Sequence, residues 1–151
     1  YMIFSGEFEH KLDKQGRLNI PSRYRTFFLK GIVLTRGYDQ CIVAYTVEMM
    51  QNLAKDISKM PNTSSYTRKL ARFTFSSAYI LDVDSNGRIL VPSVLRNYAN
   101  ISNKCMMVGT GDLLELWNPE LWEIEKLNIN ENSEKITEFL SKQKFILEGG
   151  N

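Results

Sequence analysis

Histidine, cysteine and long apolar runs are scarce in this chain, and their scarcity excludes several classes of protein. One histidine and two cysteines occur among the 151 residues. The histidine, His10, has no acid, cysteine or serine around it in a recognisable catalytic pattern, and no glycine-rich loop could cradle a phosphate. We therefore predict a protein that is not an enzyme, with no catalytic residue, no metal site, no cofactor and no small-molecule substrate.

The few cysteines and the short apolar runs also indicate the cellular compartment of the protein. Cys41 and Cys105 have no CxxC partner and lie on apolar segments, which is typical of buried free thiols in a reducing compartment. No run approaches the roughly 18 apolar residues of a membrane span. The start of the chain is mixed polar and acidic, without the apolar segment of a signal peptide. The sequence therefore predicts a cytoplasmic protein with no membrane partner.

What the chain does contain is one stretch that occurs twice. Residues 13–25 read DKQGRLNIPSRYR, and residues 84–96 read DSNGRILVPSVLR. Asp, Gly, Arg, Pro, Ser and a final Arg recur at a single offset of 71 residues. The motif residues are Asp13, Gly16, Arg17, Pro21 and Arg25 in the first copy and Asp84, Gly87, Arg88, Pro92 and Arg96 in the second. These identities in register indicate a tandem duplication.

The chemistry of each copy predicts a tight turn, a short strand and then a helix. Aspartate at the first turn position can accept a hydrogen bond from the backbone two residues on, and glycine at the fourth can take a positive φ. The arginine after the glycine lies close enough to the aspartate for a charge-assisted hydrogen bond. Proline then opens a helix, because its missing N–H costs nothing there. We expect these helices over residues 21–29 and 92–98, ended by Gly31 and Asn100.

Each half is expected to run strand, turn, strand, short helix, strand, turn, strand, long helix. The other strands are expected over residues 3–12, 31–35, 41–45, 78–83, 105–108 and 113–117, and the other helices after a Thr46 cap, over 64–76, after Asn118 and over 133–147. A half of about 70 residues is too small to bury its own sheet faces, so we expect the two halves to pack together.

The pattern Asp-x-x-Gly-Arg-hydrophobic-x-hydrophobic-Pro, present twice, resembles the MraZ family of the SpoVT/AbrB-like DNA-binding superfamily. Residues 2–10 and 34–42 are also similar to that family, and the resemblance covers residues 2–140. It implies an α+β fold in which two tandem AbrB-like half-repeats interleave into a swapped-hairpin β-barrel flanked by helices. We expect a first repeat over residues 2–60, a connecting helix over 61–77, a second repeat over 78–128, and a C-terminal helix with a frayed tail over 129–151.

The same resemblance implies a sequence-specific DNA-binding transcriptional regulator of the division and cell-wall gene cluster. Such a protein is expected to associate with the nucleoid and to bind direct repeats in promoter DNA as a ring-shaped homo-oligomer. The charge distribution agrees with a phosphate-binding face. Residues 1–36 carry seven basic and three acidic residues, whereas residues 80–117 carry three basic and four acidic ones. The candidate DNA-binding residues are Lys14, Arg17, Arg23, Arg25 and Arg88.

The first copy is expected to provide the main DNA contact. Arg17 should read a guanine, because arginine can donate two hydrogen bonds to guanine O6 and N7. The other three basic residues of this copy are expected to hold phosphates, which fix position without reading sequence. The second copy has Ser85 in place of Lys14 and Val94 in place of Arg23, so its contribution is expected to be smaller.

A second hypothesis stays open at this point. The duplicated hairpins could serve as subunit contacts in a non-enzymatic oligomeric scaffold protein, through their Asp–Arg pairs. That hypothesis predicts oligomers with little salt-sensitive affinity for DNA. The sequence also leaves open whether the second hairpin contacts DNA or a neighbouring subunit.

Overall fold

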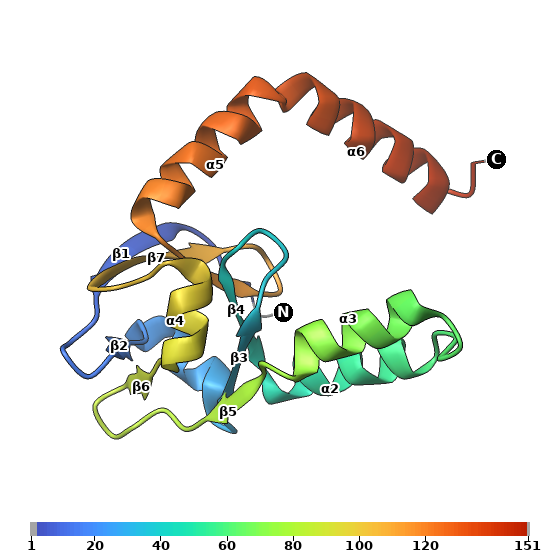
Figure 1. Cartoon of the computed structure of the whole chain (residues 1–151). Helices are drawn as coiled ribbons and strands as arrows, with labels where there is room; N and C mark the ends of the chain where they lie inside the picture. The colour runs from blue at the N-terminus through green and yellow to red at the C-terminus, as the bar shows by residue number, and fades with distance from the viewer. Residues whose placement is uncertain (1–2, 151) are drawn as a thin grey trace. The chain divides into compact units, whose positions relative to one another are not determined.

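The computed structural model describes residues 3–150. By internal contacts the chain divides into two compact units, the first ending at Pro119 and the second beginning at Glu120. The strands, all in the first unit, are β1 (Glu7–Lys11), β2 (Arg17–Asn19), β3 (Ile32–Arg36), β4 (Ile42–Thr46), β5 (Tyr79–Leu81), β6 (Arg88–Leu90), β7 (Lys104–Gly109) and β8 (Leu114–Trp117). The helices of that unit are α1 (Ser22–Arg25), the 3-10 helix η1 (Thr26–Phe28), α2 (Val47–Ser58), α3 (Ser65–Phe75) and α4 (Ser93–Ala99) (Figure 1).

These elements confirm the predicted α+β class, and their pairing is antiparallel throughout. A six-stranded sheet has the order β1-β7-β8-β4-β3-β5, and β2 pairs with β6 in a separate two-stranded sheet. Exchanging the four strands of the first half for those of the second turns this order into its own reverse. The two halves are therefore related by a pseudo-two-fold arrangement, which is the structural result of the duplication.

The halves interleave rather than pack as separate blocks. The first strand of each half pairs with the third strand of the other, as β1 does with β7 and β5 with β3. The fourth strands β4 and β8 also pair with each other. The predicted swapped-hairpin β-barrel is not confirmed, because the hydrogen-bonded sheet is not closed and ends at the edge strands β1 and β5. The two strands that follow the turns, β2 and β6, pair with each other instead of joining that sheet.

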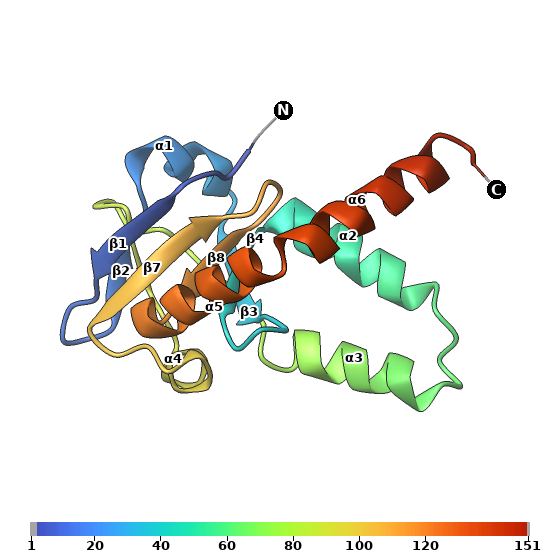
Figure 2. The same ribbon diagram turned by 90° about the horizontal axis from the view of Figure 1, so that it is seen from above.

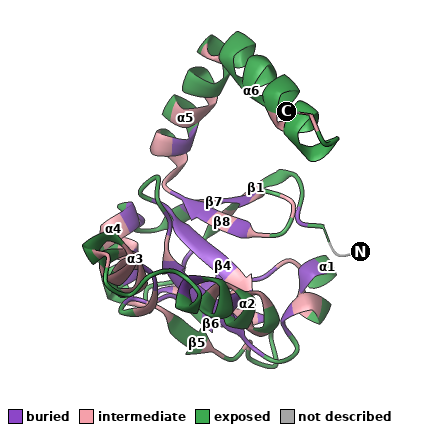
Figure 3. Cartoon of the chain, turned by 90° about the vertical axis from the view of Figure 1, so that its right-hand side faces the viewer, coloured by how far each residue is buried: buried purple, intermediate pink, exposed green. Residues whose placement is uncertain are grey.

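Side-chain packing, not hydrogen bonding, joins the two sheets. Leu18 of β2 and Ile89 of β6 are almost fully buried in the same apolar cluster as Leu34 of β3 and Leu114 of β8. Figure 3 shows β4 and β8 mainly in the colour of buried residues. Each fully buried aliphatic side chain stabilises the fold by about 1.5–3 kcal/mol. The core thus holds the β2–β6 ribbon in a fixed position over the larger sheet.

Most local predictions are confirmed. Pro21 and Pro92 stand directly before α1 and α4. Helix α4 ends at Asn100 with a φ of 56°, and the Thr46 side chain caps α2. The helix expected over residues 21–29 is shorter and changes to a 3-10 turn, which ends where the N–H of Gly31 donates to the Phe28 carbonyl, three residues back.

The strand expected over residues 3–12 is also shorter. Gly6 has a φ of 83°, which interrupts the extended backbone, and β1 therefore begins only at Glu7. Before that break, Phe4 forms an isolated bridge with Gly111. The strand expected over residues 78–83 keeps only three residues, Tyr79–Leu81, since the chain after Leu81 leaves its partner β3.

The two cysteines are free and buried, as predicted. Burial raises the pKa of the Cys105 thiol to about 12 and raises that of Cys41 as well, so both thiols stay protonated at neutral pH. His10 lies half-buried in β1, where burial lowers its pKa. Within residues 3–150, no helix has the length and apolar character needed to cross a membrane.

Helix α5 (Pro119–Glu131) leads into the second unit, which also contains α6 (Ser133–Leu147). The predicted helix over residues 133–147 is confirmed. No residue of α6 is buried. Its exposed large apolar side chains are Ile136, Phe139, Leu140, Phe145, Ile146 and Leu147. The division into four predicted segments stays a prediction.

Candidate nucleic-acid interface

The first motif turn is built around the side chain of Asp13. Its Oδ1 accepts hydrogen bonds from the backbone N–H groups of Gln15 and Arg17, each at 2.9 Å. The N–H of Gly16 donates to the Asp13 carbonyl at 3.0 Å, and Gly16 has a φ of 87°. An L-residue with a side chain adopts that conformation only with strain, so the glycine is what permits the turn to close. The predicted turn is confirmed.

The second turn repeats the first bond for bond. Asp84 Oδ1 accepts from the N–H groups of Asn86 and Arg88, each at 2.9 Å. Gly87 donates to the Asp84 carbonyl at 2.9 Å with a φ of 78°. Figures 1 and 2 both place the two turns on one side of the first unit, with α2 and α3 on the opposite side.

Each turn holds the guanidinium of its arginine through one nitrogen only. Arg17 Nε donates to Asp13 Oδ2 at 2.7 Å, and Arg88 Nε donates to Asp84 Oδ2 at 3.1 Å. Hydrogen bonds from the backbone N–H of the same arginine are the main reason why the pKa of each aspartate is lowered, so both stay charged at neutral pH. Among residues 3–150, no group bonds the terminal nitrogens of either guanidinium. Those nitrogens can donate to a bound molecule.

The β2–β6 ribbon brings the two arginines onto one face. Its register pairs Arg17 with Leu90, Leu18 with Ile89 and Asn19 with Arg88. Successive strand residues point to opposite faces, and the central pair faces the core. The outer face therefore carries Arg17, Asn19, Arg88 and Leu90. Diagonal neighbours on such a face lie roughly 7–8 Å apart. Asn19 and Leu90 are absent from the sequence-based candidates, because nothing in the sequence shows that β2 and β6 pair.

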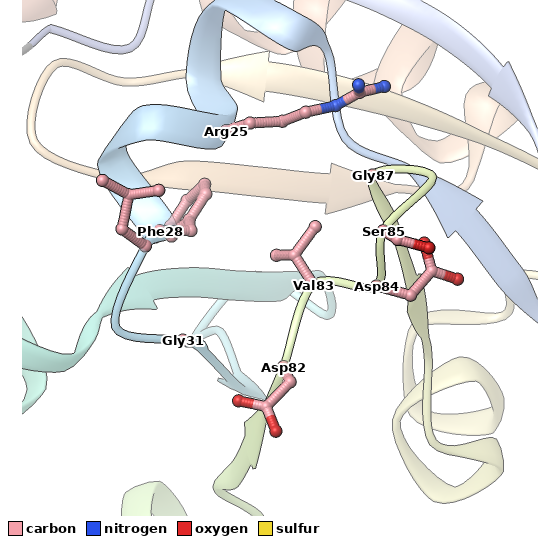
Figure 4. Close-up of a pocket in the computed structure, with 9 residues that line it drawn as sticks. Arg25, Phe28, Gly31, Asp82, Val83, Asp84, Ser85 and Gly87 are labelled. Atoms are coloured by element: carbon pink, nitrogen blue, oxygen red, sulfur yellow. The ribbon is translucent and has the colours of Figure 1, made fainter.

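The final arginine of each copy crosses to the turn of the other copy. Arg25 Nε donates to the Ile20 carbonyl at 2.9 Å, and a Cβ on Gly87 would clash with its guanidinium. Figure 4 shows the Arg25 side chain extending from α1 toward the Gly87 loop. Arg96 does the same, with Nε donating to the Val91 carbonyl at 3.1 Å and its guanidinium against Gly16. We call Arg25 and Arg96 the crossed arginines. They give both motif glycines a second reason to lack a side chain.

We expect Arg25→Ala to lower the free energy of unfolding by about 1.5 kcal/mol, the low end for a hydrogen bond from a charged donor, because the side chain is half-buried. Urea denaturation measures this loss, and Arg96→Ala is the matched control with the same geometry. Unchanged stability in both variants would contradict the structural assignment. The predicted phosphate contact of Arg25 is tested separately: if it exists, the slope of log affinity against log salt falls by about one.

The other two basic candidates occupy different surroundings. Lys14 is exposed in the first turn, beside Arg17. Arg23 lies against β1, with its Cζ 4.3 Å from the ring centroid of Phe8, and its Nη2 donates to the Ser5 carbonyl at 3.3 Å. Lys14 and Arg17 thus belong to the same turn, whereas Arg23 is held against an aromatic ring with its side chain exposed.

The surroundings of the second turn are more acidic. A depression of about 360 Å³ beside it is lined by Asp82 and Asp84 together with Arg25 (Figure 4). At the offset of the duplication, Asp82 and Ser85 stand where the first copy has Lys11 and Lys14. The first turn is therefore better suited to a polyanion. Among residues 3–150, no group of three or more His, Cys, Asp or Glu side chains could hold a metal ion.

Comparison with known proteins agrees with the duplicated motif. The family model described as MraZ protein matches twice, over residues 3–73 and 74–143. The transcriptional regulator MraZ of Roseiflexus castenholzii is 34% identical over 143 residues, which cover 95% of this chain and 100% of the relative. The transcriptional regulator MraZ of Roseiflexus sp. strain RS-1 matches with the same identity and coverage.

Proposed function

Because this chain belongs to the MraZ family across both of its halves, we propose that it is a sequence-specific DNA-binding transcriptional regulator and not an enzyme. One observation carries the DNA-binding part of the proposal. Two arginines, Arg17 and Arg88, share the outer face of the β2–β6 ribbon, and each is held by a carboxylate through Nε while its terminal nitrogens have no protein partner among residues 3–150.

The ribbon has the right form to enter DNA. The major groove of B-DNA is about 12 Å wide and admits a two-stranded β-ribbon. There the terminal nitrogens of Arg17 donate to guanine O6 and N7, with Arg88 in a secondary role. Lys14 and Arg23 hold phosphates on the side of the first turn, and Arg25 does so only if its crossed position leaves a nitrogen within reach. Because the surroundings of the second turn are acidic, we assign the main DNA contact to the first turn.

We further propose that the protein regulates the division and cell-wall gene cluster from the nucleoid, bound to direct repeats as a ring-shaped homo-oligomer. Each chain contains one β2–β6 ribbon with two related turns. Identical chains around a ring therefore present equivalent ribbons at a regular spacing. Direct repeats suit such a ring, whereas a two-fold dimer prefers a palindrome. The exposed apolar side chains of α6, among them Phe139, Leu140 and Ile146, provide a surface for self-association.

A gel-shift titration across salt tests the proposal, with DNA from upstream of the protein's own gene and a scrambled duplex as control. We expect a shift of the native fragment only. Its affinity should fall by about 10³–10⁵ between 50 and 200 mM salt, because several chains of the ring together make six to ten phosphate contacts and displace the condensed counterions there. No shift of either fragment at low salt, together with a large oligomer in size-exclusion chromatography, would favour the scaffold hypothesis instead.

A further inference from the structure

We propose that Asn19 and Leu90 read bases beside the two hairpin arginines, so that the outer face of the β2–β6 ribbon recognises an asymmetric base sequence. The inference rests on the proposed DNA binding and adds two specificity-determining residues to it. It also explains how a pseudo-symmetric ribbon gives one chain a direction on DNA.

The register places all four side chains in one patch. Asn19 lies directly opposite Arg88, and Leu90 lies directly opposite Arg17. Backbone bonds from Ile20 to Gly87 and from Val91 to Gly16 flank these two pairs. Both are therefore pairs of the non-hydrogen-bonded kind, whose side chains approach most closely. On the outer face of the ribbon, the residue opposite each arginine is therefore its directly facing cross-strand neighbour.

The side chains of Asn19 and Leu90 are not part of the buried core. Leu90 is 54% exposed, although Ile89 and Val91 on either side of it are each 1% exposed. The Asn19 side chain is exposed, and no group within residues 3–150 hydrogen-bonds its amide. A large apolar residue and an unbonded amide beside two arginines are the groups that recognise base edges.

Comparison of the two copies of the motif shows that the outer face of the ribbon is asymmetric. Asn19 and Leu90 are separated by the same offset of 71 residues as Arg17 and Arg88, so they occupy one position of the motif in its two copies. The arginine is kept in both copies, while the neighbouring reading position differs. The pseudo-two-fold ribbon is thus symmetric in its guanine-reading groups and asymmetric beside them. An asymmetric reader selects sequences with a direction, as direct repeats have.

The chemistry of each side chain predicts which base it contacts. An asparagine amide pairs with adenine N6 and N7, and an apolar side chain contacts the thymine methyl group. The four side chains span roughly 7–8 Å along the diagonal, which is about two base-pair steps of 3.4 Å. We therefore expect adenine under Asn19 and thymine under Leu90, each within a step or two of a guanine read by the opposite arginine.

Selection of bound duplexes from a randomised library, with the full-length protein, tests the inference. We expect Asn19→Leu to lose the adenine preference at one position by about 5- to 150-fold, equivalent to the 1–3 kcal/mol of one base contact. Asn19→Asp should move that preference to cytosine, since a carboxylate accepts from cytosine N4. The double variant N19L/L90N should exchange the two preferences. Lys14→Ala is the control that weakens all sequences equally.

The outcomes separate this inference from the proposed function. If the wild-type protein selects a defined sequence and all three variants select the same one, the ribbon residues do not read bases and the inference is wrong, while the proposed function stands. If the wild-type protein selects nothing and shows no salt-sensitive binding, the proposed function fails first. Both positions are exposed, so circular dichroism should show that the variants fold.

Discussion

Arg17→Ala is expected to abolish binding of the native promoter fragment at protein concentrations at which the wild-type protein binds it fully. The substitution removes both terminal nitrogens that would donate to one guanine, a contact worth about 1–3 kcal/mol of discrimination. It also leaves the Asp13 carboxylate without its partner at the DNA surface, because Arg17 Nε is the group that neutralises it. An unpaired carboxylate facing phosphates adds repulsion to the lost contact.

Arg88→Ala is the matched control for this experiment, since the second turn has the same hydrogen bonds as the first. We expect a smaller loss of affinity, because Asp82 and Ser85 leave the second turn without the lysines that flank Arg17. Fluorescence anisotropy with both fragments at a fixed salt concentration gives the two affinities. Equal losses in the two variants would show that both turns read DNA, and the assignment of the main role to the first copy would be wrong.

The sequence was enough to predict those features that arise from neighbours along the chain. The turn of Asp13 and Gly16, the stop at Asn100 and the Thr46 cap all depend on residues within a few positions of each other. The same holds for the Asp–Arg pair of each turn. Local chemistry fixes these features whatever the rest of the fold does.

Contacts between the two copies could not be predicted in the same way. The pairing of Asn19 with Arg88 and the position of Arg25 against Gly87 join residues that are far apart in sequence. The duplication shows that the copies are alike, but it does not show that their strands interleave. For that reason the sequence predicts a phosphate contact for Arg25 but not its position against Gly87. The resemblance supplied the interleaving, whereas its swapped-hairpin barrel is not confirmed, because the larger sheet ends in two edge strands.

One long-range contact has the largest expected effect on stability. Gly109 is the last residue of β7; its N–H donates to the Gly6 carbonyl at 2.9 Å, and its Cα faces the backbone of Phe4 and Ser5. A Cβ at Gly109 would clash with the Phe4 carbonyl carbon and the Ser5 nitrogen. A flexible side chain could move away from that clash, whereas this backbone is fixed by two hydrogen bonds between Phe4 and Gly111.

We therefore expect Gly109→Ala to lower the free energy of unfolding by about 3 kcal/mol, the upper end for overpacking. That loss should lower Tm by about 6–12 °C for a chain of this size. Relief of the clash must move Phe4, which is 2% exposed and packs on the rings of Tyr24 and Phe27 at centroid distances of 5.0 and 5.1 Å. Movement of Phe4 weakens the contact between residues 4–5, at the start of the first half, and β7 of the second half.

Gly111→Ala in the same loop separates the clash from ordinary backbone strain. Gly111 has a φ of 89°, but a Cβ there would meet no atom within 4 Å. It should therefore lose only the roughly 1–2 kcal/mol of a left-handed alanine. Thermal denaturation followed by circular dichroism compares the two variants. If Gly109→Ala is no less stable than Gly111→Ala, the approach of residues 4–5 to β7 is looser than the structure has it. If Gly109→Ala is much less stable than Gly111→Ala, the packing of the two halves between residues 4–5 and β7 requires a residue without a side chain at position 109.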